Sequence, residues 1–298
     1  MDYIGIIKKA YAMTLKHKFL WIFGILAGGV GFFNFNLSWP NFSTENSHFD
    51  QSLASFDWTH FWINYGGLVI SLLVILGVAA ILLMVLNIIS QAALVASADR
   101  LARNEECNFK IGFRLGAHQF WRLLGMSLLY FLMILASLIV LAGPIIIAII
   151  NKTYVFAVIW GILLFFVCLA FWILVSLIYP YSLRVLVLEK SGLGQSIRQS
   201  LHFFRDHWKE VVVMYLLLLA ISFVFALAMV MAGLLVGGII LAIGFGIFLA
   251  SHLAAVVYAI ILGLLFLAAL AVIGGVFNTF YSISLTLTYN YLVKPTAD

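Results

Sequence analysis

Two groups of polar residues stand inside otherwise apolar stretches of this sequence. Asn87 and Gln91 are four residues apart, with Ser90 beside them. Asn278, Ser282 and Thr286 also follow a spacing of four. Residues three or four apart share one face of a helix, so each group predicts a polar stripe. Amides and hydroxyls can bind a ligand in a cavity between the two stripes or hydrogen-bond a neighbouring helix, and the sequence leaves both interpretations open.

Neither stripe supplies the residues that catalysis needs. We expect no acid or base deep within an apolar segment, where membrane proton relays keep ionisable residues. P-loop, HExxH and GxSxG motifs are also missing from the sequence. We therefore predict no catalytic, metal-binding or cofactor-binding residues and no enzyme activity.

The stripes lie in long apolar segments. The chain has 298 residues, of which 65% are hydrophobic and 9% are charged, whereas about 25% of the residues in soluble domains are charged. A bilayer core needs about 20 apolar residues in helix, because lipid offers no partner to a bare backbone group. We predict one all-α integral membrane domain, 1–298, with six transmembrane helices. Their predicted ranges are 18–35, 61–96, 121–150, 153–181, 211–236 and 252–291.

Basic residues alternate with the apolar segments. Residues 97–120 and 182–210 are rich in Lys and Arg, whereas 36–60 contains acidic residues and neither Lys nor Arg. Of the 16 Lys and Arg residues, only Lys152 falls in a segment on the opposite side. The positive-inside rule therefore places both termini in the cytoplasm. Because the charges cluster beside apolar runs, they indicate a membrane surface and no nucleic acid partner.

The last apolar block leaves the number of helices open. Residues 211–289 contain no Lys, Arg, Asp or Glu. The glycine-rich stretch 237–251 could be a loop, a re-entrant segment or part of a seventh span. We favour two helices joined by this link, because it is too short for a full span and two turns. Two glycine pairs, Gly24 with Gly28 and Gly233 with Gly237, have the small-xxx-small spacing that permits close helix packing.

A basic, amphipathic stretch precedes each expected pair of spans. His17, His118 and His207 mark similar places in these stretches, each close to a Trp. The pattern predicts three interfacial helices and a threefold hairpin repeat over approximately 1–97, 98–181 and 182–298. Each basic residue near an anionic leaflet adds about 1 kcal/mol of attraction. The candidate contacts to lipid head groups are Lys9, Lys16, Lys110, Arg114, Arg198 and Arg205.

Three stretches carry a resemblance to a known family. They are YIGIIKKAYAMTLKHKFLWIFGILAGG, RVLVLEKSGLGQSIRQSLHFFRDHW and FNTFYSISLTLTYNYLV. The chain resembles the bacterial membrane-domain family named after glycerophosphoryl diester phosphodiesterases, and related uncharacterised six-span proteins. Ser196 stands where that pattern has Ala. The resemblance implies a membrane domain of a bacterial inner membrane without the catalytic barrel, for which these 298 residues leave no room.

We therefore expect a non-enzymatic, multi-pass protein of the bacterial cytoplasmic membrane that acts in envelope or lipid handling. Its expected partners are membrane lipids and another membrane or envelope protein. The alternative is a small-molecule or lipid transporter or channel without intramembrane charge coupling. A water-accessible path lined by Asn87, Gln91, Asn278 and Ser282 would favour transport, and a dry, packed interior would favour the structural interpretation.

Overall fold

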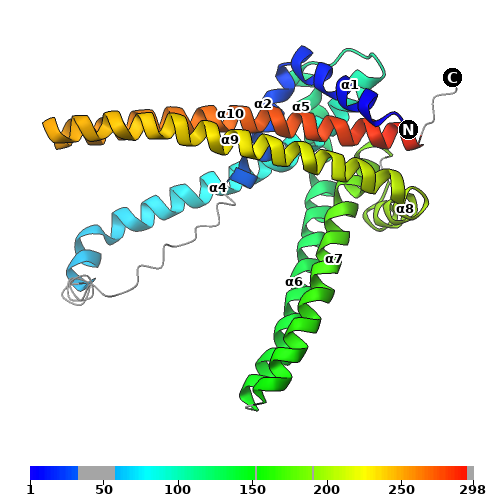
Figure 1. Ribbon diagram of the computed structural model, residues 1–298, viewed down its shortest axis with the longest axis horizontal. Coiled ribbons are helices and arrows are strands. Elements are labelled where there is room, and N and C mark those ends of the chain that lie inside the picture. Colours follow the sequence, from blue (N-terminus) through cyan, green and yellow to red (C-terminus); the bar gives the residue numbers. More distant parts are fainter. Residues whose placement is uncertain (33–57, 152, 190, 294–298) are drawn as a thin grey trace.

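The computed structural model describes residues 1–32, 58–151, 153–189 and 191–293. Within these ranges the chain consists of helices joined by short turns, without a strand (Figure 1). The helices are α1 (Tyr3–Lys16), α2 (Phe19–Phe32), α4 (Trp58–Ala102), α5 (Phe109–His118), α6 (Phe120–Ile150), α7 (Tyr154–Leu188), α8 (Leu193–Asp206), α9 (Trp208–Ala250) and α10 (His252–Val293). The all-α prediction is confirmed for this part of the chain.

Five helices, α4, α6, α7, α9 and α10, are long and apolar enough to cross a membrane. The chain is therefore a polytopic membrane protein by the length and composition of its helices. The first predicted span, 18–35, corresponds to α2, which is apolar over Phe19–Gly28 and shorter than the others. The end of that predicted span, and most of the acidic segment 36–60, lie outside the described residues.

The predicted link at 237–251 is helical. Helix α9 continues to Ala250, and only Ser251 separates it from α10. The Ser251 hydroxyl accepts a hydrogen bond from the Ala254 amide at 3.4 Å, as a helix N-cap does. The expectation of two helices is thus confirmed, and the loop interpretation of the link is wrong. In an apolar environment the backbone N–H and C=O groups are best satisfied by helical hydrogen bonds, and the glycines of this stretch do not prevent these bonds.

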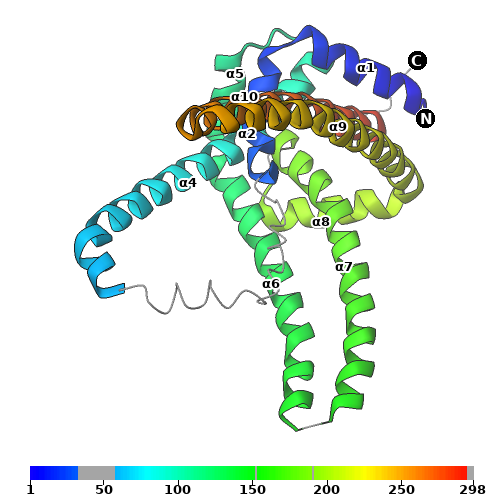
Figure 2. The same cartoon turned by 60° about the vertical axis from the view of Figure 1, so that its left-hand side comes forward.

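Buried side chains gather at one end of the long helices. We call this region the hub; it comprises α1, α2, α5 and α8 with residues 87–102 of α4, 120–130 of α6, 175–188 of α7, 208–221 of α9 and 275–293 of α10. The remaining parts of the long helices form three arms: α4 and the α6–α7 hairpin (Figure 2), and the α9–α10 hairpin (Figure 1). Large apolar side chains from Ile63 to Met84 of the α4 arm are exposed, as lipid-facing residues are.

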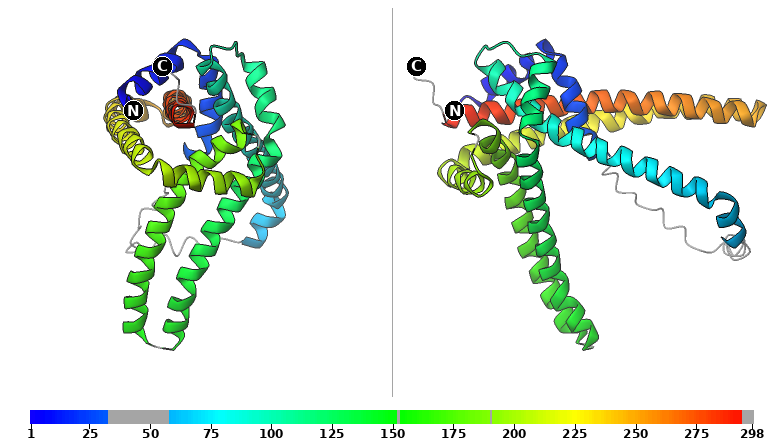
Figure 3. Two further views of the ribbon diagram at one scale, coloured as in Figure 1. Left: turned by 90° about the vertical axis from the view of Figure 1, so that its right-hand side faces the viewer. Right: turned by 180° about the vertical axis from the view of Figure 1, so that it is seen from behind.

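The basic short helices and the apolar arms occupy opposite ends of the molecule. The basic short helices lie at the hub, beside the N-terminus and the end of α10, whereas the α6–α7 turn and Ser251 lie at the far tips of their arms (Figure 1). The segments predicted to share one side of the membrane thus share one end of the molecule. The arms leave the hub in different directions (Figure 3).

Three short helices precede long ones, as the basic stretches predicted. Helix α1 ends at the C-cap His17, α5 ends with His118, and α8 ends at the C-cap His207. The buried residues of α5 are Gly112 and Gly116, and those of α8 are serines. In α5 and α8 the most deeply buried residues are therefore small, because close contact with the long helices selects them, whereas α1 buries Ile6 and Met13. The threefold repeat stays a prediction.

Candidate polar site in the hub

Helix α2 lies against both helices that carry the polar stripes, α4 and α10. The Asn87 amide nitrogen donates to the carbonyl oxygens of Leu26 and Ala27 at 2.9 and 2.8 Å. The Asn278 amide nitrogen donates to the Gly24 carbonyl at 3.0 Å. Both asparagines therefore bond the backbone of a third helix, which is the interhelical role that the sequence left open.

Two glycines make this contact possible. A Cβ atom on Gly24 would overlap the Gly275 carbonyl, and one on Gly275 would overlap the backbone of Ile25. A Cβ atom on Gly28 would lie 3.2 Å from the Asn278 amide. The small-xxx-small interpretation is confirmed for Gly24 and Gly28. It is wrong for Gly237, whose Cβ atom would meet nothing within 4 Å.

A cavity of about 230 Å³ opens between α4, α7 and α10. Gln91, Asn278 and Ser282 line it, as the stripe pattern predicted. Asn87, Ser90 and Thr286 do not line it. Thr286 donates instead to the Ser282 carbonyl at 2.9 Å, and the Ser90 hydroxyl is buried without a partner. The cavity is thus lined by half of the predicted residues, and of the other three Asn87 bonds α2.

Arg184 is the residue of this cavity that the sequence pattern missed. The sequence places it in the basic segment 182–210, outside the predicted spans, but the residue is only 3% exposed and lines the cavity. Its guanidinium donates to the carbonyls of Pro180 at 2.5 Å and Ser282 at 3.0 Å, which joins α7 to α10. Its Nε atom is buried and has no hydrogen-bond partner.

A sequence signal for this burial exists. Arg184 is followed by Val185, Leu186, Val187 and Leu188, so the apolar run continues beyond the charge. Helix α7 extends through these residues to Leu188, whereas our predicted span ended at 181. The arginine therefore lies within a helix that is apolar on both sides of it. Because Arg184 lies only four residues before the end of α7, the expectation that no acid or base lies deep within a span stays a prediction.

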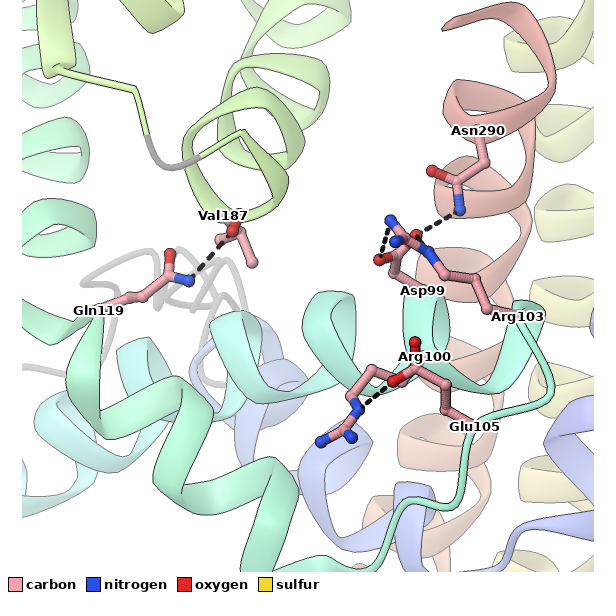
Figure 4. A network of polar contacts seen from close by, with 7 residues as sticks. All are labelled: Asp99, Arg100, Arg103, Glu105, Gln119, Val187 and Asn290. Atoms are coloured by element: carbon pink, nitrogen blue, oxygen red, sulfur yellow. Dashed lines mark hydrogen bonds and ion pairs between the residues drawn. The ribbon is translucent and has the colours of Figure 1, made fainter. Parts of the chain in front are cut away.

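Further polar contacts join the ends of the long helices (Figure 4). Asp99, 8% exposed, accepts from the Asn290 amide at 2.8 Å and pairs with Arg103 at 2.7 Å, so it connects α4 to α10. Gln119, at the start of α6, donates to the Val187 carbonyl of α7 at 3.0 Å. These contacts hold the hub together on the side that carries the basic helices.

Hydroxyl groups connect α8 to the same region. The Ser182 hydroxyl is 2.8 Å from that of Tyr130 and 2.6 Å from that of Ser200, and all three residues are buried. At the ends of α7 and α10, the Tyr289 hydroxyl donates to the Glu189 carboxylate at 2.5 Å. Helix α8 is therefore held against the other hub helices by hydrogen bonds as well as by its apolar side chains.

The predicted lipid contacts all lie on the surface. Each of the six side chains is exposed, two on each short helix: Lys9, Lys16, Lys110, Arg114, Arg198 and Arg205. Beside α1, an apolar groove of about 1000 Å³ runs between this helix and the α9–α10 hairpin. Lys8 and Tyr11 border it, and Ala220, Val224 and Phe277 form part of its wall.

Among the residues that the structure describes, no three His, Cys, Asp or Glu side chains group as a metal site would require. The acidic residues Glu45, Asp50 and Asp57 lie outside those residues. Around the cavity, the described residues bring together a buried cation, amides and hydroxyls. Such groups can donate hydrogen bonds and stabilise negative charge.

Long apolar helices that pack together in a hub crossed by interhelical polar contacts define a multi-pass helical membrane protein. The chain matches the model of the Family of unknown function (DUF7544) over residues 18–289, and it belongs to that family. No curated protein and no solved structure matches the chain.

Proposed function

We propose that the protein is a non-enzymatic, multi-pass protein of a bacterial cytoplasmic membrane that binds membrane lipid at its hub. Both termini and the hub face the cytoplasm in this proposal, because nearly all Lys and Arg residues belong to segments at the hub end. The resemblance to the phosphodiesterase membrane-domain family supports the same lipid-related role. An envelope or membrane protein partner would bind the exposed hub surface.

The apolar groove beside α1 carries this proposal. Its volume of about 1000 Å³ is ample for lipid acyl chains. Its walls come from α9 and α10, which are apolar enough to cross the membrane. Lys8 borders the groove, and Lys9 and Lys16 on the same helix are exposed. An acyl chain in the groove would therefore place an anionic head group close to a basic helix.

Filling the groove tests the proposal. Ala228 lines the groove, and Ala226 is an exposed residue of the same helix that does not line it. We expect Ala228→Trp to reduce the number of lipids that remain bound to the purified protein, as counted by native mass spectrometry. Ala226→Trp should retain the wild-type number. Equal lipid retention in both variants and the wild type would contradict the proposed groove.

Cysteine labelling tests the proposed orientation. Glu105 lies beyond the hub end of α4, and Phe245 lies near the far end of α9. In a background with Cys107 and Cys168 replaced by Ala, Glu105→Cys should react with an impermeant reagent only from the cytoplasm. Phe245→Cys and Glu45→Cys should not react from that side. Cytoplasmic labelling of position 45 would reverse the proposed orientation.

A second candidate function is the transport of a small molecule or lipid through the hub cavity. The observation that favours it is the cavity of about 230 Å³ lined by Gln91, Asn278 and Ser282. Transport requires that substituted cysteines at positions 91 and 282 react from both sides of the membrane in turn. Reaction from one side alone would leave the cavity as a binding site.

A further inference from the structure

We propose that the cavity at Arg184 binds an oxyanion, a phosphate or carboxylate group, which pairs with the buried guanidinium. This site is separate from the α1 groove: Arg184 and the residues around the cavity belong to α2, α4, α7 and α10, and none of them lines the groove. A ligand at Arg184 and a lipid at α1 can therefore be tested independently.

The first argument is the uncompensated charge of Arg184. An arginine in a protein stays protonated, and burying a charge without a counter-ion is strongly unfavourable because the charge loses its hydration. The ion pairs among the described residues join Arg100 to Glu105, Arg103 to Asp99 and His202 to Asp206, and none of them includes Arg184. Its two carbonyl acceptors bear only partial charges. A ligand anion would compensate the remaining positive charge.

The second argument is the number of donors without an acceptor. A guanidinium has five N–H groups, and two acceptors are shown for Arg184, the carbonyls of Pro180 and Ser282. The Nε–H group is buried and has no partner. Unpaired buried donors are rare in folded proteins, because the hydrogen bonds to water that they lose are not replaced.

The third argument is the chemistry of the cavity wall. Gln91, Asn278, Ser282 and Tyr281 come from α4 and α10 and line it together with Arg184. No Asp or Glu lines it. The amide nitrogen of Gln91 donates to the Asn87 side chain at 2.8 Å and that of Asn278 to the Gly24 carbonyl at 3.0 Å, and each carries a second N–H group. The wall therefore surrounds one cation with amide and hydroxyl groups and carries no negative charge that would repel an anion. Guanidinium groups recognise phosphate and carboxylate through paired N–H donors.

The size of the cavity shows which part of a ligand it could hold. A volume of about 230 Å³ suits an anionic group with a few further atoms. Tyr179 lines this cavity and also a second, apolar pocket of about 560 Å³ between α6 and α7, which Phe131 and Trp172 help to form. The anion can thus be free in solution or the head group of a lipid whose chain lies between α6 and α7.

Thermal unfolding of the full chain in nanodiscs tests the site with defined probes. The free probes are sodium phosphate and sodium acetate in phosphatidylcholine nanodiscs, and the lipid probe is phosphatidic acid mixed into the same nanodiscs. We expect at least one probe to raise the Tm of the wild type. Arg184→Gln should weaken its binding at least tenfold, which is the loss expected for a charge-assisted hydrogen-bond pair. The exposed Lys209→Gln should stay within twofold of the wild type.

Two further variants keep the test decisive. Arg184→Met removes the unpaired charge, so without a probe it should melt at or above the wild-type Tm and show no probe-dependent shift. If Arg184→Gln does not fold, Arg184→Lys replaces it; this variant keeps the charge without the planar fork and should bind more weakly than the wild type.

The source of the anion is distinguished by filling the α6–α7 pocket. Ser176 lines that pocket, and Ala170 is an exposed residue of the same helix that does not. Weaker phosphatidic acid binding in Ser176→Phe, but not in Ala170→Phe, would identify a lipid head group. Phosphate or acetate binding that is equal in both variants would identify a free anion. The proposal is overturned if no probe shifts the wild type, or if Arg184→Gln binds the probes as the wild type does.

Discussion

The hub and the arms are built mostly from the same apolar amino acids, yet their side chains have different surroundings. In the hub, Leu20, Phe23 and Ile283 are completely buried, and polar bonds cross between helices. In the arms, side chains such as Leu68, Phe166 and Leu264 are more than half exposed. Lipid tails solvate an apolar side chain as well as a protein core does, so the arms gain little from packing. Stability must therefore come mainly from close packing and hydrogen bonds in the hub.

The largest expected change concerns the direction of the arms. Helix α9, with 43 residues, is about 65 Å long at 1.5 Å per residue, roughly twice the hydrocarbon thickness of a bilayer. The α6–α7 and α9–α10 arms point in different directions (Figure 3), but both must lie in one bilayer. We expect spin labels at Asn151 and Ser251, at the two tips, to be closer in nanodiscs than in detergent.

A label pair within the hub serves as the control for this measurement. Glu105 and Asp206 both belong to the hub end and are exposed. Their distance should be the same in detergent and in nanodiscs. A tip distance that does not change between the two environments would show that the arms are as rigid as the hub.

The next largest effect is expected at the closest helix contact. Gly24→Leu places a side chain where the Gly275 carbonyl lies, and such overpacking should lower the free energy of unfolding by about 3 kcal/mol or more. Gly263→Leu, in the α10 arm, adds the same side chain where nothing lies within 4 Å. Its Tm in detergent should equal that of the wild type. Similar losses in both variants would remove the distinction between hub and arm.

Hydrogen bonds between hub helices should have a smaller effect. Asn87→Leu and Asn278→Leu each remove amide donors to α2 and should cost about 1 kcal/mol of stability. Ser71→Ala, in the α4 arm, removes only a local bond to the Leu68 carbonyl and should change the Tm very little. Lower Tm with unchanged lipid or anion binding in the Asn variants would assign both asparagines to the scaffold rather than to a site.

The smallest effect is expected from His17, where α1 turns into α2. Burial, followed by the nearby charge of Lys16, lowers the pKa of His17 below its ordinary value of 6.5. The folded state therefore favours the neutral imidazole, so its contribution to stability is present above pH 6.5 and is lost as the pH falls through the lowered pKa. Thermal unfolding at pH 7 and pH 5 should show a slightly larger loss for the wild type than for His17→Gln. An identical pH dependence in both would assign the loss to other groups.

Local pattern was sufficient for most of the helices. The apolar runs correctly indicated the long helices α4, α6, α7, α9 and α10. The basic stretches, each with a histidine near its end, correctly indicated the short helices α1, α5 and α8. Both signals are local, because hydropathy and helical period depend on neighbouring residues. The helix boundaries were less accurate: α7 continues to Leu188 beyond its predicted end. The glycines of 237–251 suggested a break that the helix does not make.

The sequence by itself determined the membrane class, the alternation of charge, and the positions of the polar residues along α4 and α10. Only the tertiary structure decided what these residues contact. It placed α2 against Asn87 and Asn278, and it buried Arg184 beside Ser282, 98 residues away in the chain. The periodicity of a helix shows which of its residues share a face, but the helix that covers this face is selected by long-range packing. That packing made Arg184, which the sequence places in a basic segment outside the spans, the buried charge of the hub.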